Sequence, residues 1–104
     1  MIEIKSISEL DDLLLVTTKV VLVFSSSWCG PCKILKPQLE KISSDSKYNK
    51  IKFCKIDIDE CGDLSDKYKI SSLPTTVFLN NGDEKSRITG ADIIKITKTL
   101  ENFK

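Results

Sequence analysis

The chain has 104 residues and 40% apolar content, which suit one globular domain with an ordinary hydrophobic core. Its 16 basic and 15 acidic residues leave a formal net charge of +1 and are scattered along the sequence, which argues against nucleic-acid or membrane binding through bulk charge. No apolar stretch approaches the length of a membrane span, and residues 1–5 lack the regions of a secretory signal. We therefore expect a single soluble domain over residues 1–104, located in the cytoplasm.

The amino-terminal residues predict a short strand and then a helix. Ile2 and Ile4 alternate with charged residues, as in an edge strand. Ser8 followed by Asp11 is typical of a helix amino terminus, and the helix is expected to end near Thr17.

The run Val20–Phe24 is apolar without interruption, which predicts a central strand covered on both faces. Cys29 and Cys32 follow directly, and the next apolar residues recur at helical spacing: Ile34, Leu35, Leu39 and Ile42. Pro37 is expected to kink this helix. A cysteine between a strand and a helix lies where unpaired backbone N–H groups and the helix dipole stabilise a thiolate. A dithiol/disulfide switch is therefore the leading functional hypothesis.

The second half of the chain predicts a strand, a short helix, a hairpin and a final helix. These are expected at residues 51–59, 64–68, 75–79 with 84–88, and after Gly90. The first strand and short helix imply a right-handed parallel crossover. The last helix carries an apolar stripe of Ile93, Ile96, Leu100 and Phe103.

Two further cysteines lie outside this pair. Cys54 shares a strand face with Ile56 and Ile58, which favours a buried, inert thiol. Cys61 follows acidic residues that oppose thiolate formation, at a helix start that favours it. A regulatory or intermolecular disulfide at Cys61 is the less favoured of its two interpretations.

Four cysteines also raise the question of a metal-binding module. Structural zinc sites usually show a second closely spaced pair, whereas Cys54 and Cys61 are seven positions apart and the chain has no histidine. We therefore expect no metal site.

Several motifs together resemble the thioredoxin family over essentially the full chain. They are the run from Trp28 to Lys33 after the apolar strand, Ser72–Thr75 before the next strand, the Asn81-Gly82 turn, and Gly90 before the last helix. The resemblance implies an α/β thioredoxin fold, with a five-stranded mixed sheet of order 1-3-2-4-5 flanked by four helices. The strand order comes from the resemblance alone.

The resemblance also implies the chemistry. Cys29 is expected to be the exposed nucleophile and Cys32 the resolving thiol, and the two form a disulfide at the end of each cycle. The activity implied is that of a protein-disulfide reductase contributing to electron transport and cell redox homeostasis. No cofactor is expected. The implied partners are protein disulfides and an NADPH-dependent thioredoxin reductase, with the chain itself a monomer.

Four positions are implied to tune the redox centre. Gly30 and Pro31 set the turn, although proline is also simply favourable at the start of a helix. Val23 occupies a position where the family usually has a buried aspartate that assists proton removal from Cys32. Lys55 matches the lysine that accompanies that aspartate, so it is expected to reach outward or lose part of its charge. We therefore expect slow resolution of the mixed disulfide near neutral pH.

Four further residues are implied to bind substrate. Trp28 forms an apolar lip, although an aromatic side chain here also suits a core position. Leu73 and Pro74 form a cis peptide bond facing the cysteines, and the Leu73 backbone pairs with substrate. Without the resemblance, a proline here reads as a rigid turn. Gly90 completes the set.

Two rival functions remain beside the reductase. One is a thioredoxin-like interaction subunit that holds a partner without turnover, although the intact dithiol argues against a redox-inactive role. The other is an oxidase or isomerase, whose relatives tend to carry histidine or other residues between the cysteines. Gly30 and Pro31 resemble the reducing branch.

Overall fold

The structure is a computed structural model that describes all 104 residues. Its elements in chain order are β1 (Ile2–Glu3), α1 (Ile7–Val16), β2 (Lys19–Ser25), α2 (Gly30–Ser43), the short 3-10 helix η1 (Ser46–Tyr48), β3 (Ile51–Asp57), α3 (Gly62–Lys67), β4 (Thr75–Asn80), β5 (Asp83–Thr89) and α4 (Ile93–Phe103). No helix is both long and apolar enough to cross a bilayer.

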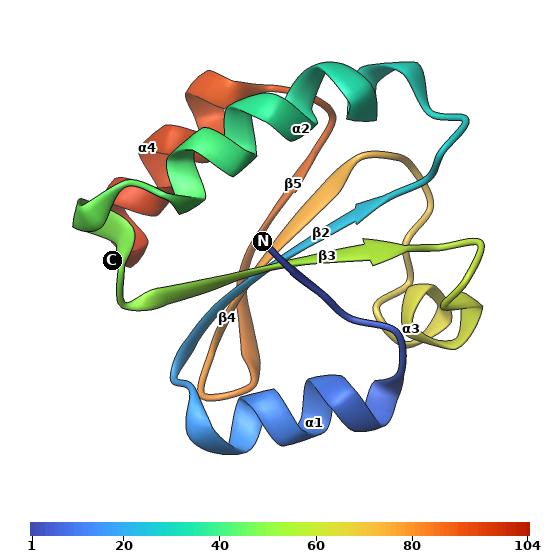
Figure 1. Ribbon diagram of the computed structural model, residues 1–104, viewed down its shortest axis with the longest axis horizontal. Helices are drawn as coiled ribbons and strands as arrows, with labels where there is room; N and C mark the ends of the chain where they lie inside the picture. The colour runs from blue at the N-terminus through green and yellow to red at the C-terminus, as the bar shows by residue number, and fades with distance from the viewer.

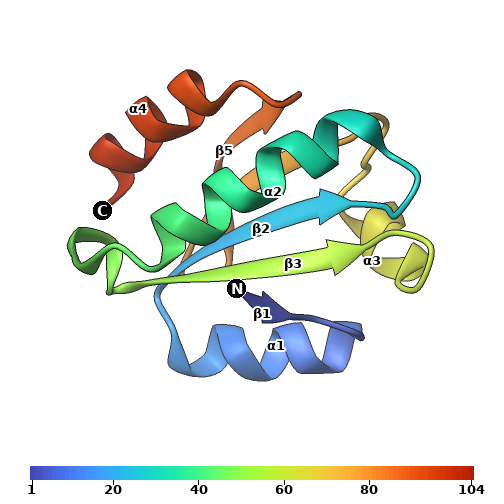
Figure 2. The ribbon, with the colours of Figure 1, turned by 45° about the horizontal axis from the view of Figure 1, so that its top comes forward.

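The five strands form one mixed sheet in the order β1-β3-β2-β4-β5. The β1, β3 and β2 strands run parallel, and β4 and β5 are antiparallel to their neighbours. Figure 2 shows β2 and β3 side by side, with the carboxyl end of β2 leading into the loop before α2. The expected thioredoxin fold and its strand order are confirmed.

Helices cover both faces of the sheet, with α2 and α4 on one side and α1 and α3 on the other (Figure 1). Alternate residues of β2 supply the two cores: Val20, Leu22 and Phe24 pack on the α1 and α3 side, whereas Val21 and Val23 pack on the α2 and α4 side. This explains why β2 is apolar without alternation, since both of its faces are buried.

Two details of the helices differ from expectation. The α1 helix is capped by Ser6 instead of Ser8: the Ser6 Oγ accepts from the Glu9 amide at 3.1 Å, and the Glu9 carboxylate accepts from the Lys5 amide at 3.0 Å. The longer glutamate side chain allows this reciprocal capping, so the helix begins earlier. Ile34 is 68% exposed because it lies off the stripe that buries Leu35 and Leu39 in α2.

The β4–β5 hairpin turns through Asn81 and Gly82, which have φ angles of 53° and 82°. Positive φ at both turn residues is typical of a type I′ turn, and it explains the Asn-Gly pair. The expected hairpin is therefore confirmed, with each strand slightly longer than the sequence suggested. The apolar stripe of α4 is also confirmed, since Ile96 and Leu100 are fully buried.

Candidate active site at the amino terminus of helix α2

Cys29 and Cys32 form a disulfide with a Cα–Cα distance of 5.3 Å. Cys29 is the residue that caps α2, and its Sγ accepts a hydrogen bond from the Cys32 amide at 3.2 Å. Pro31 lies in the first turn, where its missing N–H costs no helical hydrogen bond. The strand-turn-helix placement predicted for the pair is confirmed.

The two cysteines are almost equally buried, with 5% of Cys29 and 6% of Cys32 exposed. The expectation that Cys29 is the exposed member is therefore wrong for this disulfide form. As the capping residue, Cys29 folds its side chain back over the first helical turn toward Cys32. The two cysteines differ instead in where they lie along the helix: Cys29 caps α2, whereas Cys32 lies inside its first turn.

Trp28 lies outside the core, with 66% of its surface exposed. Its indole Nε1 donates a hydrogen bond to the Asp59 carboxylate at 2.9 Å. The Asp59 amide in turn donates to the Asp57 carboxylate at 2.9 Å, which orders the loop after β3. The core interpretation of Trp28 is wrong. The sequence does not predict Asp59 as the hydrogen-bond partner of Trp28, because the two residues are 31 positions apart and no local pattern relates them.

A groove of about 470 Å³ lies beside Cys29. Trp28, Ile58, Ile70 and Leu73 give it apolar walls. The amide and carbonyl of Leu73 form no hydrogen bond within the protein. The groove therefore combines apolar surface, an unpaired stretch of backbone and the capping cysteine.

The Leu73–Pro74 peptide bond is cis, as expected. The Pro74 carbonyl accepts from the Gly90 amide at 2.8 Å, and Gly90 has a φ of 90° that favours glycine. Gly90 thus lies behind the cis peptide and is not among the residues that line the groove. The structure brings Trp28 and Leu73 to the groove, with Gly90 supporting the segment from behind.

A second pocket, of about 400 Å³, lies on the side of Cys32. Val23 and Lys55 are paired in register across β2 and β3, and both line this pocket together with Asp57. Lys55 is half-buried and forms none of the five ion pairs of the protein. The Ser26 hydroxyl, also in the pocket, is buried without a hydrogen-bond partner. Val23 itself offers Cys32 no proton acceptor.

Cys54 and Cys61 are free thiols with 0% and 1% of their surface exposed. Burial raises the pKa of Cys54 to about 11. Burial also raises the pKa of Cys61, and the nearby carboxylates of Asp63 and Glu60 raise it further. The Cys61 Sγ donates to the Ile4 carbonyl at 3.4 Å. The inert interpretation of Cys54 is confirmed, and the surroundings of Cys61 oppose a reactive thiolate.

No group of three or more histidine, cysteine, aspartate or glutamate side chains is arranged to hold a metal ion. Cys54 and Cys61 belong to the core cluster on the α1 and α3 side of the sheet. Cys32 lines the pocket that also contains Val23 and Leu35, which pack in the other core cluster. The four cysteines therefore do not converge on one point.

The sequence and the structure both match known thioredoxins. The family model described as Thioredoxin matches residues 3–102. Thioredoxin-2 of Saccharomyces cerevisiae is 38% identical over 99 residues, which cover 94% of this chain and 93% of the yeast protein. Thioredoxin of Mycoplasma pneumoniae is 42% identical over 88 residues, or 85% of this chain and 84% of that protein. The solved structure of Plasmodium falciparum thioredoxin superposes with a TM-score of 0.93 at 30% identity, covering 100% of both chains.

Proposed function

The chain belongs to the thioredoxin family and is a thiol-disulfide oxidoreductase that reduces protein disulfides, and from this premise we propose how its residues divide the work. Cys29 is the nucleophile and Cys32 the resolving thiol. The observation that carries this assignment is the hydrogen bond from the Cys32 amide to the Cys29 Sγ at the helix end.

The reaction consumes one substrate disulfide for each protein dithiol. The Cys29 thiolate attacks one substrate sulfur, the substrate S–S bond breaks, and the first substrate thiolate leaves and takes up a proton. Cys32 then loses its proton and attacks the Cys29 Sγ, which breaks the mixed disulfide and releases the second substrate thiolate. Two electrons pass to the substrate, and the Cys29–Cys32 disulfide remains.

The end of helix α2 favours ionisation of Cys29 in the dithiol form. The unpaired amides of the first turn and the positive end of the helix dipole face the capping side chain. Cys32 lies inside the helix and gains less from these groups. This difference supports Cys29 as the first attacking thiolate, with Gly30 and Pro31 shaping the turn between the two sulfurs.

The groove beside Cys29 is the proposed docking site for the substrate polypeptide. The Leu73 amide and carbonyl are free to pair with an extended substrate backbone, in the manner of strand addition. Trp28 adds an apolar wall whose orientation is fixed by its hydrogen bond to Asp59. Pro74 and Gly90 act by holding the segment in place.

Release of the Cys32 proton is the step that we expect to be slow in this chain. Val23 carries no carboxylate, and Lys55 beside it has no ionic partner. The carboxylates that line the 400 Å³ pocket beside Cys32 are Glu3 and Asp57, and neither is hydrogen-bonded to Cys32; Asp57 instead accepts from the Asp59 amide. The proposed route for the Cys32 proton is therefore to solvent in that pocket. Solvent is a weaker acceptor than a positioned carboxylate, so resolution near neutral pH is slow.

The biological setting proposed is a monomer in the cytoplasm that is recycled by an NADPH-dependent thioredoxin reductase and contributes to electron transport and redox homeostasis. The unpaired thiols of Cys54 and Cys61 suit a reducing compartment. Because one relative is named as the mitochondrial thioredoxin of Bos taurus, the location needs its own test. Recovery of the endogenous protein in an organelle fraction would contradict the cytoplasmic assignment.

Trapping of the mixed disulfide tests the division of roles between the cysteines. We expect Cys32→Ser to accumulate a covalent complex with insulin through Cys29, and Cys29→Ser to form none and to lose insulin reduction. Intact mass spectrometry with peptide mapping identifies the linked cysteine. A complex linked through Cys32 in the Cys29→Ser variant, formed at the same rate, would reverse the assignment.

A further inference from the structure

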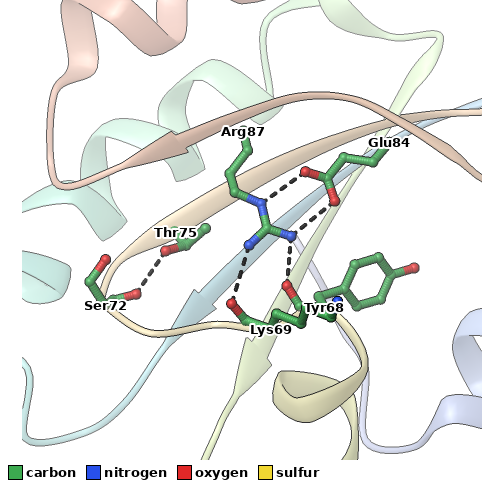
Figure 3. Close-up of polar contacts among 6 residues, drawn as sticks. All are labelled: Tyr68, Lys69, Ser72, Thr75, Glu84 and Arg87. Carbon is green, nitrogen blue, oxygen red and sulfur yellow. Dashed lines mark hydrogen bonds and ion pairs between the residues drawn. The ribbon is translucent and has the colours of Figure 1, made fainter.

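The segment that presents Leu73 is held at one end by Arg87 of strand β5 and at the other by Gly90, which directly follows β5. It begins after Tyr68, at the end of α3, and runs to Pro74. At its far end the Gly90 amide donates to the Pro74 carbonyl at 2.8 Å. At its near end the Arg87 side chain binds backbone carbonyls, as Figure 3 shows.

The Arg87 guanidinium joins two carbonyls to one carboxylate. One terminal nitrogen, Nη2, donates to the Tyr68 carbonyl at 2.6 Å, and Nη1 donates to the Lys69 carbonyl at 3.4 Å. The Nε and Nη2 atoms also donate to the two Glu84 oxygens at 2.8 and 2.9 Å. This fork-to-fork pairing fixes the plane of the guanidinium before it meets the loop.

The two carbonyls lie at a strained turn. Lys69 has a φ of 54°, a left-handed conformation that costs energy in any residue other than glycine. The Lys69 amide donates to the Asp66 carbonyl at 3.1 Å and the Ile70 amide to the Ser65 carbonyl at 2.9 Å, which together end α3 in a Schellman motif. Arg87 stabilises this turn by binding carbonyls that the helix leaves unpaired.

The turn sets the direction in which the chain enters the docking groove. Directly after it, Ile70, Ser71, Ser72 and Leu73 line the groove beside Cys29. Inside the segment, the Thr75 hydroxyl donates to the Ser72 carbonyl at 2.7 Å (Figure 3), and the Leu73 backbone is left unpaired. Because this segment is already held at both ends, binding of the substrate does not have to supply the entropy cost of ordering the segment.

We propose that Arg87, held by Glu84, is a positioning residue that preorganises the 70–74 segment for docking of polypeptide disulfides. It touches neither cysteine, so it acts on recognition of the polypeptide and leaves the intrinsic chemistry of the dithiol unchanged. The inference rests on the docking role proposed above for Leu73.

The test compares a polypeptide disulfide with a small one that does not need the groove. The reduced protein is mixed with insulin or with hydroxyethyl disulfide, and oxidation is followed by the fluorescence of Trp28, the single tryptophan. For Arg87→Gln we expect the second-order rate constant with insulin to fall roughly threefold to tenfold. The reason is that the 70–74 segment must then be ordered when insulin binds, and ordering one such segment lowers binding by about that factor. The rate constant with hydroxyethyl disulfide should change less than twofold.

Three further variants separate the possible causes. Lys85→Gln removes one positive charge from an exposed position on the same strand and should leave both rates unchanged. Arg87→Lys keeps the charge but cannot bridge two carbonyls and a carboxylate, so it should remain defective with insulin. Leu73→Pro removes the docking amide itself and should lower the insulin rate at least as much as Arg87→Gln.

Amide hydrogen exchange provides a readout that does not depend on turnover. In Arg87→Gln, the amides of Lys69 and Ile70, which donate to the Asp66 and Ser65 carbonyls, should exchange faster, with exchange in β2 and β3 unchanged. Equal losses with insulin and hydroxyethyl disulfide, or no loss with either, would overturn the role of Arg87. If Leu73→Pro also reduced insulin normally, the docking proposal itself would fail.

Discussion

Replacing Val23 with aspartate tests whether proton removal from Cys32 limits this protein. Val23 is 5% exposed, faces the pocket that reaches Cys32, and lies beside Lys55 in the neighbouring parallel strand. Adjacent strands are about 4.8 Å apart, so a carboxylate at position 23 can pair with the Lys55 ammonium. Their attraction at about 5 Å is about 3 kcal/mol at an effective dielectric constant of about 20.

Stability and rate should move in opposite directions in Val23→Asp. Loss of the buried valine removes about 1.5 to 3 kcal/mol of hydrophobic stabilisation, and burial of the carboxylate offsets much of its attraction to Lys55. We therefore expect a lower free energy of unfolding. Because a positioned general base contributes about 100-fold or more over solvent, the attack of Cys32 should accelerate by at least about tenfold near pH 7.

A chromogenic aromatic disulfide separates the two chemical steps in one stopped-flow trace. The first release of coloured thiolate reports the attack of Cys29, and the second reports resolution by Cys32. Only the second phase should accelerate in Val23→Asp. Val23→Asn, which has a side chain of similar size but no base, should not show the acceleration. In Val23→Asp combined with Lys55→Met, loss of the ammonium raises the pKa of the new carboxyl, so the acceleration should appear at a higher pH.

The argument is refuted if the second phase of Val23→Asp is no faster than that of the wild-type protein at any pH between about 5 and 9. An equal gain in Val23→Asn would also exclude proton transfer to the carboxylate, because the amide cannot accept the proton. Circular dichroism at the assay temperature confirms that each variant is folded before its rates are compared.

Three other predictions concern residues outside the redox centre. Burial raises the pKa of Cys54 from 9.0 to about 11, so the Cys54 thiol ionises at a lower pH in the unfolded chain than in the folded protein. As pH rises between these two values, the free energy of unfolding of the wild-type protein should fall by about 2 to 3 kcal/mol relative to that of Cys54→Ala. Parallel pH curves from urea denaturation would contradict this. Lys69→Gly should relieve the left-handed turn and raise the stability by about 0.5 to 1 kcal/mol, as checked by thermal unfolding; an equally large loss would show that the turn is not strained. Cys61, which is 1% exposed, should resist iodoacetamide in the native protein and react after unfolding, and rapid native labelling seen by mass spectrometry would show that its thiol is accessible.

The sequence by itself determined the local elements and the position of the dithiol. An apolar run such as Val20–Phe24 predicts a strand buried on both faces, and helical periodicity directly after Cys29 places that residue at a helix end. Both depend on residues that are close together in the chain. The hairpin at Asn81 and Gly82 was predictable for the same reason, since the turn requires φ angles that few residues adopt.

The tertiary structure alone decided which distant residues meet. The hydrogen bond from Trp28 to Asp59 and the contacts of Arg87 with Tyr68 depend on strand order and register, which no local pattern encodes. The near-equal burial of Cys29 and Cys32 also follows from the folded turn.

The positions of the lysines were likewise decided by the folded structure and not by any local pattern in the sequence. The lysines look scattered in the sequence, yet five of them line one pocket at the end of the sheet where β2 and β3 begin: Lys19, Lys47, Lys50, Lys52 and Lys104. Sequence separation says little about distance once strands pair, because parallel strands bring their starting residues to one edge of the sheet. The sequence therefore predicted the chemistry of the dithiol, whereas the docking groove beside Cys29 and the group of lysines at the opposite end of β2 arose only on folding.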